Sequence, residues 1–411
     1  MLALRNGLVL TVVAPAGGSP AVALAQADVL VSAVSGKVVA VGDVGETRDA
    51  LEVDVKGRVV MPGLLDAHVH VTASSADLRR AASTPPSLMN LRAVPILKGM
   101  LWRGFTTVRD CGGADVGLAT AIAEGAVEGP RLLYCGKAIS PSGGHGDFRS
   151  AGEARLCQCC DASIGRVADG VDAVREAVRD EVRKGASHIK VMASGGVASP
   201  TDRITNLQYS VAELEAIVDE AMMAGLGVAA HAYTADAIAR AVRAGVRSIE
   251  HGNLADDATL ALMKDASAFL VPTIITYERL LADGEDAGMP ADLVAKVGDL
   301  VERGVDTLAR ADALGVGIAY GSDLLGDMHP HQAEGIALHL RAQSPAAVLA
   351  ALTIGPARLF DLEGEVGVLK PGAAADLLVV DGDVATDPSV LIDAANLCVI
   401  VKAGKVVKNT L

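Results

Sequence analysis

Residues 62–70 read Pro-Gly-Leu-Leu-Asp-Ala-His-Val-His, an apolar run that ends in two histidines separated by one residue. Side chains along a β-strand alternate between its two faces with a period of two. The rings of His68 and His70 are therefore expected to point the same way from one strand. Two histidines placed like this can share a single metal ion.

Four further candidate ligands stand at the ends of later apolar runs rich in β-branched residues, each followed by a polar or glycine-containing loop. They are Lys190 in residues 188–192, His231 in residues 227–231, His251 in residues 248–251 and Asp323 in residues 317–323. Functional side chains at the carboxyl ends of successive strands are typical of a (β/α)8 barrel. The sequence therefore predicts that all six candidate ligands meet at one end of a barrel.

The spacing of these residues fits the same architecture. His68 and Lys190 are 122 residues apart, which leaves about 41 residues for each of three βα units. The later intervals are 41 residues from Lys190 to His231, 20 from His231 to His251 and 72 from His251 to Asp323. With βα units of roughly 20 to 45 residues in a barrel of about 250 or more, the ligands fall on strands 1, 4, 5, 6 and 8.

Helical patterns occupy the segments between these strands. Residues 172–184 carry valines at 174, 178 and 182 and end before a glycine, which is typical of an amphipathic helix with a C-terminal cap. Ser210 and Glu213 have the spacing of a capping box at the start of a helix that runs to Gly225. Thr234 can cap a further helix over residues 235–244. We therefore expect an α/β chain with a TIM-like barrel over residues 61–360.

The two chain ends, residues 1–60 and 361–411, are patterned as strands and turns. We expect them to pair into one small β-sandwich domain beside the barrel. The apolar run 8–14 and the small residues 23–25 resemble a secretory signal. Because Pro15 and two glycines interrupt this run and further strand patterns follow, we interpret it as the start of a sheet.

The composition favours a large folded enzyme that acts on a small molecule. The chain has 411 residues, of which 51% are hydrophobic and 21% charged, so it can bury a sizeable core. A formal net charge of −14 argues against a nucleic-acid partner, because phosphate contacts come from Lys and Arg. No apolar run approaches the roughly 18 residues of a membrane span. We expect a cytoplasmic homo-oligomer with neither nucleic acid nor membrane as a partner.

The six cysteines are too few for a disulfide framework in a chain of this length, and we expect them to be thiols. Three of them form the run Cys157-Gln158-Cys159-Cys160. This run could be a soft-metal or redox site, but it lacks CxxC spacing and a nearby partner cluster. We interpret it as part of the loop after the third barrel strand.

Several motifs, taken together, resemble a known superfamily. They are PGLLDAHVH (62–70), GGHGD (143–147), HIKVMASGGV (188–197), AAHAY (229–233), IEHGN (249–253), YGSDLLG (320–326) and the tail LKPGAAADLLVV (369–380). In this order they strongly resemble the amidohydrolase superfamily, and more narrowly its prolidase-like (Xaa-Pro dipeptidase) and imidazolonepropionase-related branch. The resemblance covers the chain essentially from end to end and implies a metal-dependent hydrolase acting on carbon–nitrogen bonds.

Lys190 is the unusual candidate ligand, because an ammonium group cannot bind a cation. Its neutral amine could react with carbon dioxide to give an anionic carbamate, and the resemblance implies this N6-carboxylated lysine as a bridge between two divalent ions. His68, His70 and Asp323 would then hold one ion, and His231 and His251 the other. Zn²⁺ is the favoured metal, although these ligands also suit Mn, Co or Fe. The alternative for Lys190 is an ion pair inside the barrel.

A water-derived nucleophile between two such ions can attack an amide carbonyl at neutral pH. Asp323 could take the proton of this nucleophile and deliver it to the leaving nitrogen. The resemblance implies that His145 hydrogen-bonds the substrate carbonyl and helps to stabilise the oxyanion. It also implies that Tyr233 contacts the substrate carbonyl or carboxylate.

Two loops offer further candidates for the substrate side. Arg203, after strand 4, could pair with a substrate carboxylate through both arms of its guanidinium group, or could simply lie in solvent. His329 and His331 follow Asp323 and could line the pocket, although a structural or peripheral role is the default.

The favoured function is cleavage of small amides or peptides, either dipeptides with C-terminal proline or N-acyl amino acids, with mycotoxin amides such as ochratoxin as an extension. A cyclic-amide hydrolase or a deaminase of the same superfamily is the main alternative. Lys190 argues against the mononuclear deaminase subtype, which typically lacks a carboxylated lysine. A non-catalytic binding protein is the third possibility, and the presence of all six candidate ligands argues against it.

Overall fold

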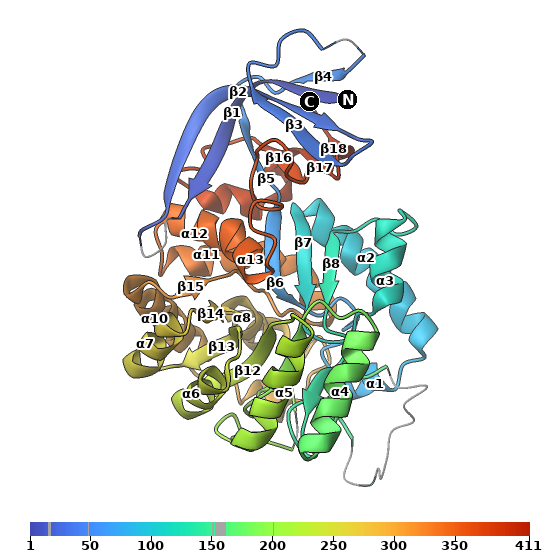
Figure 1. Ribbon diagram of the computed structural model, residues 1–411, viewed down its shortest axis with the longest axis vertical. Helices are drawn as coiled ribbons and strands as arrows, with labels where there is room; N and C mark the ends of the chain where they lie inside the picture. The colour runs from blue at the N-terminus through green and yellow to red at the C-terminus, as the bar shows by residue number, and fades with distance from the viewer. Residues whose placement is uncertain (15–17, 48, 150–151, 153–161, 200) are drawn as a thin grey trace.

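The computed structural model describes residues 1–14, 18–47, 49–149, 152, 162–199 and 201–411 (Figure 1). Strands and helices alternate through the middle of the chain, whereas strands from both chain ends gather in a separate sheet at the top of the view. This arrangement confirms the predicted α/β class.

A seven-stranded parallel sheet carries most of the predicted barrel strands, in the order β10–β9–β11–β12–β13–β14–β15. Its strands are β9 (Ala138–Ser140), β10 (Gly165–Val167), β11 (Ile189–Met192), β12 (Val228–Thr234), β13 (Ser248–Leu254), β14 (Phe269–Val271) and β15 (Gly317–Ile318). Almost every residue of β11, β12 and β13 is buried, which explains why these strands read as continuous apolar runs.

A second parallel sheet contains β6 (Leu64–Val69), β7 (Phe105–Asp110) and β8 (Arg131–Tyr134). Two backbone hydrogen bonds join its outer strands, β6 and β8, to residues next to strands β15 and β11 of the larger sheet. The Ala67 N–H donates to the Tyr320 carbonyl at 2.7 Å, and the Ser187 N–H donates to the Tyr134 carbonyl at 2.8 Å. The expected strand 3 is divided into β8 and β9 by a turn at Gly136, whose φ is 72°. The strands therefore form two sheets in place of one continuous ladder.

The three helices predicted from sequence are confirmed as α4 (Val171–Arg183), α5 (Val211–Met223) and α6 (Ala235–Ala244). They pack side by side across the strands in Figure 1. Ser210 and Glu213 form the expected capping box, and the Thr234 hydroxyl accepts from the Ala237 N–H. The remaining helices are α1 (Leu78–Ala82), α2 (Pro86–Trp102), α3 (Val116–Ala123), α7 (Asp257–Asp265), α8 (Ile274–Asp283), α9 (Ala291–Val294), α10 (Leu300–Leu314), α11 (Gly335–Leu340), α12 (Pro345–Leu352) and α13 (Ile354–Leu359).

Both chain ends contribute to one eight-stranded sheet, in the order β18–β17–β16–β5–β1–β2–β3, with β4 paired to β1. Its strands are β1 (Leu2–Val13), β2 (Ala21–Ser32), β3 (Lys37–Gly42), β4 (Leu51–Asp54), β5 (Val59–Pro62), β16 (Leu377–Val380), β17 (Leu397–Lys402) and β18 (Lys405–Asn409). The predicted pairing of the two ends is present, and the apolar N-terminal run is a strand.

The strands of the two chain ends are joined in one hydrogen-bonded sheet, because β5 pairs with β1 on one side and with β16 on the other. The sandwich arrangement expected for residues 1–60 and 361–411 stays a prediction. The inward side chains of this sheet enclose one apolar cluster that includes Leu4, Val29, Val60, Leu377 and Val399.

Within the described ranges, no helix combines the length and the apolar character required to cross a membrane. Cys111, Cys135 and Cys398 are buried free thiols, in agreement with the expectation for these three. Cys157, Cys159 and Cys160 lie outside the described residues.

Candidate metal centre

One pocket brings together all six candidate ligands and two of the three predicted substrate contacts. Its lining includes His68, His70, His145, Lys190, His231, Tyr233, His251 and Asp323. These residues come from β6 and the residue that follows it, from β11, β12 and β13, from the loop after β9 and from the loop after β15. Residues up to 255 positions apart in the sequence therefore share one cavity.

The paired histidines reach the same carboxylate oxygen. The Nε2 atoms of His68 and His70 lie 3.5 and 3.3 Å from Oδ1 of Asp323. β6 ends at Val69, so His70 stands one residue beyond the strand, but its ring still turns toward the position that the alternation of a strand predicts.

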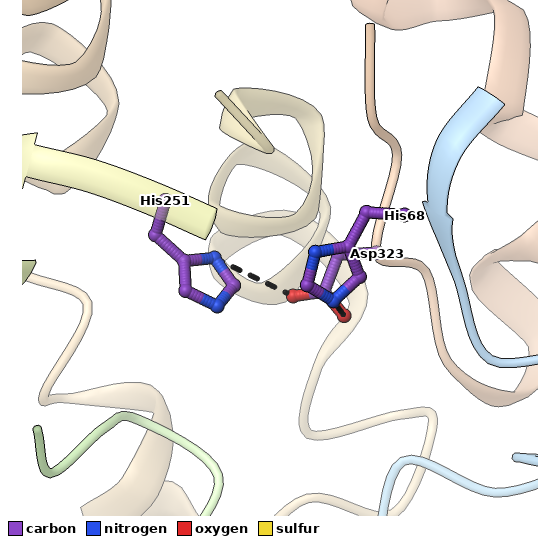
Figure 2. A group of neighbouring side chains, drawn as sticks. All are labelled: His68, His251 and Asp323. Carbon is purple, nitrogen blue, oxygen red and sulfur yellow. Dashed lines mark ion pairs between the residues drawn. The ribbon is translucent and has the colours of Figure 1, made fainter. Parts of the chain in front are cut away.

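His251 approaches Asp323 from the other side (Figure 2), with Nδ1 at 3.9 Å from Oδ2. Potential ligand atoms of His68, His251 and Asp323 all lie within 4.8 Å of one another. The ring of His231 lies 4.5 Å from that of His251, and Lys190 is buried in the same pocket with 2% of its surface exposed. The arrangement offers imidazole and carboxylate donors at a spacing suited to metal ions.

Two of these residues adopt an unusual backbone conformation. The φ angles of His251 and Asp323 are 75° and 52°, in the left-handed region that residues with a Cβ seldom occupy. Each such residue costs about 1–2 kcal/mol relative to the ordinary regions. Strain of this kind concentrates at functional sites, where the surrounding structure enforces it. Here it accompanies the turn of the two side chains toward the pocket, His251 from within β13 and Asp323 from the loop after β15.

Burial sets the charge state of three of the histidines, whereas the contact with Asp323 outweighs burial at His70 and raises its pKa. Burial lowers the pKa of His68 and His231 well below the ordinary value and that of His251 to about 3. All three are therefore neutral near pH 7, and the neutral ring is the form that binds a metal. Burial alone would raise the pKa of Asp323, but the histidines around it hold this pKa below its ordinary value. Asp323 is therefore an ionised carboxylate.

Neighbouring groups fix the orientation of the paired histidines. His68 Nδ1 lies 2.8 Å from Oε2 of Glu250, whose other oxygen accepts from Arg109 at 2.8 Å. His70 Nδ1 lies 3.0 Å from the Gly112 carbonyl. With Nδ1 engaged in both rings, Nε2 is the nitrogen left for a metal, as in many metal sites. The residues present therefore fit a metal centre.

His145 and Tyr233 lie against the histidines. The His145 ring stacks on that of His231 with a centroid distance of 4.2 Å, and the Tyr233 ring stacks on that of His251 at 5.1 Å. The hydroxyl of Tyr277 donates to that of Tyr233 at 2.7 Å. Tyr277 also lines the pocket, and sequence reasoning did not single it out.

The structure does not bring Arg203 to the pocket. This residue is exposed, and the lining of the pocket in the described part of the chain does not include it. The local loop explains the difference, because the Arg203 N–H donates to Asn206 while the preceding residue, Asp202, is the buried one. Its proposed contact with a substrate carboxylate has no support in this arrangement.

His329 and His331 are likewise absent from the described pocket lining. His329 is buried against the Ala73 carbonyl at 3.1 Å, and His331 pairs with Glu334 at 2.7 Å. Both lie in the 3₁₀ helix η1 (Gly326–Glu334), where each side chain is engaged by another protein group. The structural role expected by default is the one observed.

The remaining described wall of the pocket is largely apolar. It consists of Leu78, Phe148, Ile164, Met192, Val197, Ala198, Thr276, Leu280 and Leu325. An apolar wall opposite a cluster of polar groups is the usual form of a site for a small organic ligand.

Comparison with known proteins agrees with this geometry. The amidohydrolase family pattern matches residues 59–407. The chain is 31% identical to the ochratoxinase of Aspergillus niger over 369 residues, which cover 85% of this chain and 76% of that protein. A prolidase structure in complex with N-methylphosphonate-L-proline is 45% identical, with a TM-score of 0.94 and full coverage of both chains.

A Xaa-Pro dipeptidase structure with bound methionine is 27% identical and has a TM-score of 0.86. The match covers 99% of this chain and all of that one. The chain therefore belongs to the amidohydrolase family and is a hydrolase.

Proposed function

We propose that this protein is a binuclear metal-dependent amidohydrolase that cleaves amide or peptide bonds of small substrates. Dipeptides with C-terminal proline and N-acyl amino acids are the leading substrates, with mycotoxin amides such as ochratoxin as an extension. The observation that carries the proposal is the convergence of six candidate ligands in one pocket. The similarity to a prolidase and to an ochratoxinase supports the choice of substrates.

The proposed ligands divide into two sets. His68, His70 and Asp323 would hold one divalent ion, His231 and His251 would hold the other, and Lys190, as an N6-carboxylated side chain, would be a ligand shared by both. Zn²⁺ is the favoured metal. When bound, such ions lower the pKa of water and polarise a carbonyl group.

Asp323 and His145 carry the protein's own part of the reaction. The Asp323 carboxylate is ionised, so it can accept the proton of the attacking water and deliver it to the leaving nitrogen. An amide needs this delivery because an amide anion leaves poorly. His145 contacts the substrate carbonyl from the side of the pocket next to His231, and Tyr233 contacts the carbonyl or the free carboxylate.

The proposal includes an architecture for the whole chain. The two parallel sheets correspond to a (β/α)8 barrel over residues 61–360, and backbone hydrogen bonds from β6 to Tyr320 and from Ser187 to β8 support this closure. Residues 1–60 and 361–411 form the smaller domain. A cytoplasmic location, a homo-oligomeric state and the absence of nucleic-acid and membrane partners remain predictions from the sequence.

The experiment that tests the function combines a metal count with a substrate comparison. Elemental analysis of purified protein is expected to give close to two divalent ions per chain, and a chelator is expected to abolish hydrolysis. The substrate panel contains prolyl dipeptides, their C-terminal amides, N-acyl amino acids and cyclic amides.

A wild-type protein that distinguishes a dipeptide from its amide supports a free carboxylate as a recognised group. Indifference to amidation, or preference for cyclic amides, would overturn the dipeptidase assignment in favour of a cyclic-amide hydrolase. Active protein that contains only trace metal would overturn the binuclear mechanism.

A further inference from the structure

A chain of buried polar side chains leads from His145 into the loop that follows β11. His145 Nδ1 lies 3.0 Å from the Ser199 hydroxyl oxygen, and this hydroxyl donates to Oδ1 of Asp202. The other oxygen of Asp202 accepts from Nε2 of Gln208 at 2.8 Å. The backbone N–H of His145 in turn donates to Oε1 of Gln208 at 3.1 Å. The four residues thus form a closed hydrogen-bonded ring beside the pocket.

The direction of these hydrogen bonds shows that Nδ1 of His145 carries a hydrogen. A serine hydroxyl has a single hydrogen, and in Ser199 that hydrogen goes to Asp202. The Ser199 oxygen can therefore only accept from His145, so Nδ1 of His145 is a donor. Nε2 is the remaining nitrogen, and it has no hydrogen-bond partner among the described residues.

The ring of His145 is also held by packing. It stacks on His231, and the backbone of Gly196 approaches so closely that a Cβ at that position would lie 2.3 Å from Cε1 of His145. Only glycine fits this approach, because real Cβ contacts do not come within 3.0 Å. The contacts leave the imidazole little freedom to rotate.

Lys296, just after α9, ties down the loop that carries this network. Its Nζ donates to the carbonyls of Ser199 at 2.5 Å, Asp202 at 2.8 Å and Gly196 at 3.4 Å. Burial would raise the pKa of the Asp202 carboxyl, but its contacts with His145 and Ser199 and the charge of Lys296 hold this pKa below its ordinary value. The network therefore ends in an ionised, buried carboxylate.

We infer that Ser199 and Asp202 are positioning residues that act through His145. They hold Nδ1 as the donor to Ser199, so that the ring has one orientation and presents Nε2 to the substrate side of the pocket. The inference rests on the proposed function, which places His145 on the substrate side of the pocket. In catalytic triads a carboxylate accepts directly from Nδ1 of the histidine and so fixes the orientation of the ring. Here the hydroxyl of Ser199 lies between the carboxylate of Asp202 and the histidine.

The kinetic test is a double-mutant cycle with an N-acyl proline or a prolyl dipeptide as substrate. Ser199→Ala and Asp202→Asn are each expected to lower kcat by about 10- to 150-fold, the effect of losing a hydrogen bond to a charged group, with KM nearly unchanged. In a His145→Ala background, Ser199→Ala is expected to cost less than about two-fold, because its effect passes through the missing ring. Losses that multiply in the double variant would overturn the inference.

Thr201→Val is the matched control. Its hydroxyl donates to the Gly143 carbonyl at 3.2 Å and joins the same two loops without touching His145. If this variant lowers kcat as strongly as Ser199→Ala, the effect belongs to general loop structure and the inference is wrong.

A second readout does not depend on hydrolysis. In ¹⁵N spectra of histidine-labelled protein, with the His145 signals assigned by their loss in His145→Ala, Nδ1 of the wild type is expected to appear protonated. Ser199→Ala and Asp202→Asn are expected to move that signal toward a mixture of tautomers, and an unchanged signal in both variants contradicts the inference. If no amide is hydrolysed at all, the proposed function fails, while this spectrum still decides on the network.

Discussion

Nδ1 of His68 lies 2.8 Å from Oε2 of Glu250, so a carboxylate 182 residues further along the chain fixes the orientation of the first paired histidine. Glu250 directly precedes His251 on β13, and its second oxygen accepts from the buried guanidinium group of Arg109. One strand therefore supplies both a candidate ligand and the group that orients another. Such outer partners usually affect metal affinity nearly as much as the ligands do.

Glu250→Gln is expected to weaken metal binding by about 10- to 100-fold, because the variant no longer provides a carboxylate for His68. Titration of metal-free protein with Zn²⁺ against a competing chelator measures the affinity. Glu215→Gln, on the exposed face of α5, is the matched control and should bind as the wild type does. Equal affinity in the wild type and in Glu250→Gln would show that the contact with His68 has no role in metal binding.

Lys190→Ala is expected to remove the proposed bridge and most of the activity. A short carboxylic acid added to the medium should restore part of the hydrolysis, because it can occupy the space of the missing carbamate. Activity and metal content are measured with and without the acid. Wild-type turnover with unchanged metal content in this variant would contradict the bridging role.

Asp323→Asn separates proton transfer from metal binding. The amide keeps the volume and one oxygen donor but accepts no proton at neutral pH, so kcat should fall by roughly 100-fold or more. Metal content should change much less than kcat. A parallel loss of both would identify Asp323 chiefly as a ligand, and the proton acceptor would have to be another group.

His339 is expected to make the stability depend on pH. Burial lowers its pKa from 6.5 to about 4, so this histidine takes up a proton on unfolding. Its contribution to stability is fully present above pH 6.5 and is lost as the pH falls toward 4, because the unfolded chain then binds more protons. Between pH 6.5 and 4.5 the loss is on the order of 2–3 kcal/mol.

His339→Leu should therefore show a smaller fall in the free energy of unfolding over this range than the wild type. Urea titrations of metal-free wild type and variant at both pH values measure the difference, since all other histidines contribute equally to the two proteins. Parallel pH dependence in the two proteins would rule out a contribution from His339.

The sequence could predict the elements whose signals are local. β11 and β12 are almost continuously buried, so they read as apolar runs. α5 and α6 begin at capping residues whose side chains accept from a backbone N–H three positions further on. The division of strand 3 at Gly136 and the single terminal sheet depend on long-range pairing, which local patterns do not encode. For that reason the alternation of strands and helices was predicted and the continuity of the sheets was not.

The same distinction applies to the site. The six candidate ligands were found because each lies in a strand or just beyond one, and neighbouring parallel strands bring such positions together whatever the loops do. For Arg203 the sequence left a substrate contact and a solvent-exposed position open, because neighbouring residues in an irregular loop can face opposite ways; there Arg203 is exposed and Asp202 is buried. Glu250, Ser199 and Tyr277 were missed because their partners lie 182, 54 and 44 residues away.

At His251 and Asp323 the left-handed backbone lowers stability, while the side chains that it carries belong to the candidate metal centre. Thermal stability and function therefore have opposite requirements at these two positions. Glycine there would relieve the torsional penalty while removing the imidazole and the carboxylate. Selection of variants for heat resistance alone would therefore favour the loss of these two side chains, as in other proteins that trade stability for activity. Engineering of a hardier protein is best confined to positions other than these two.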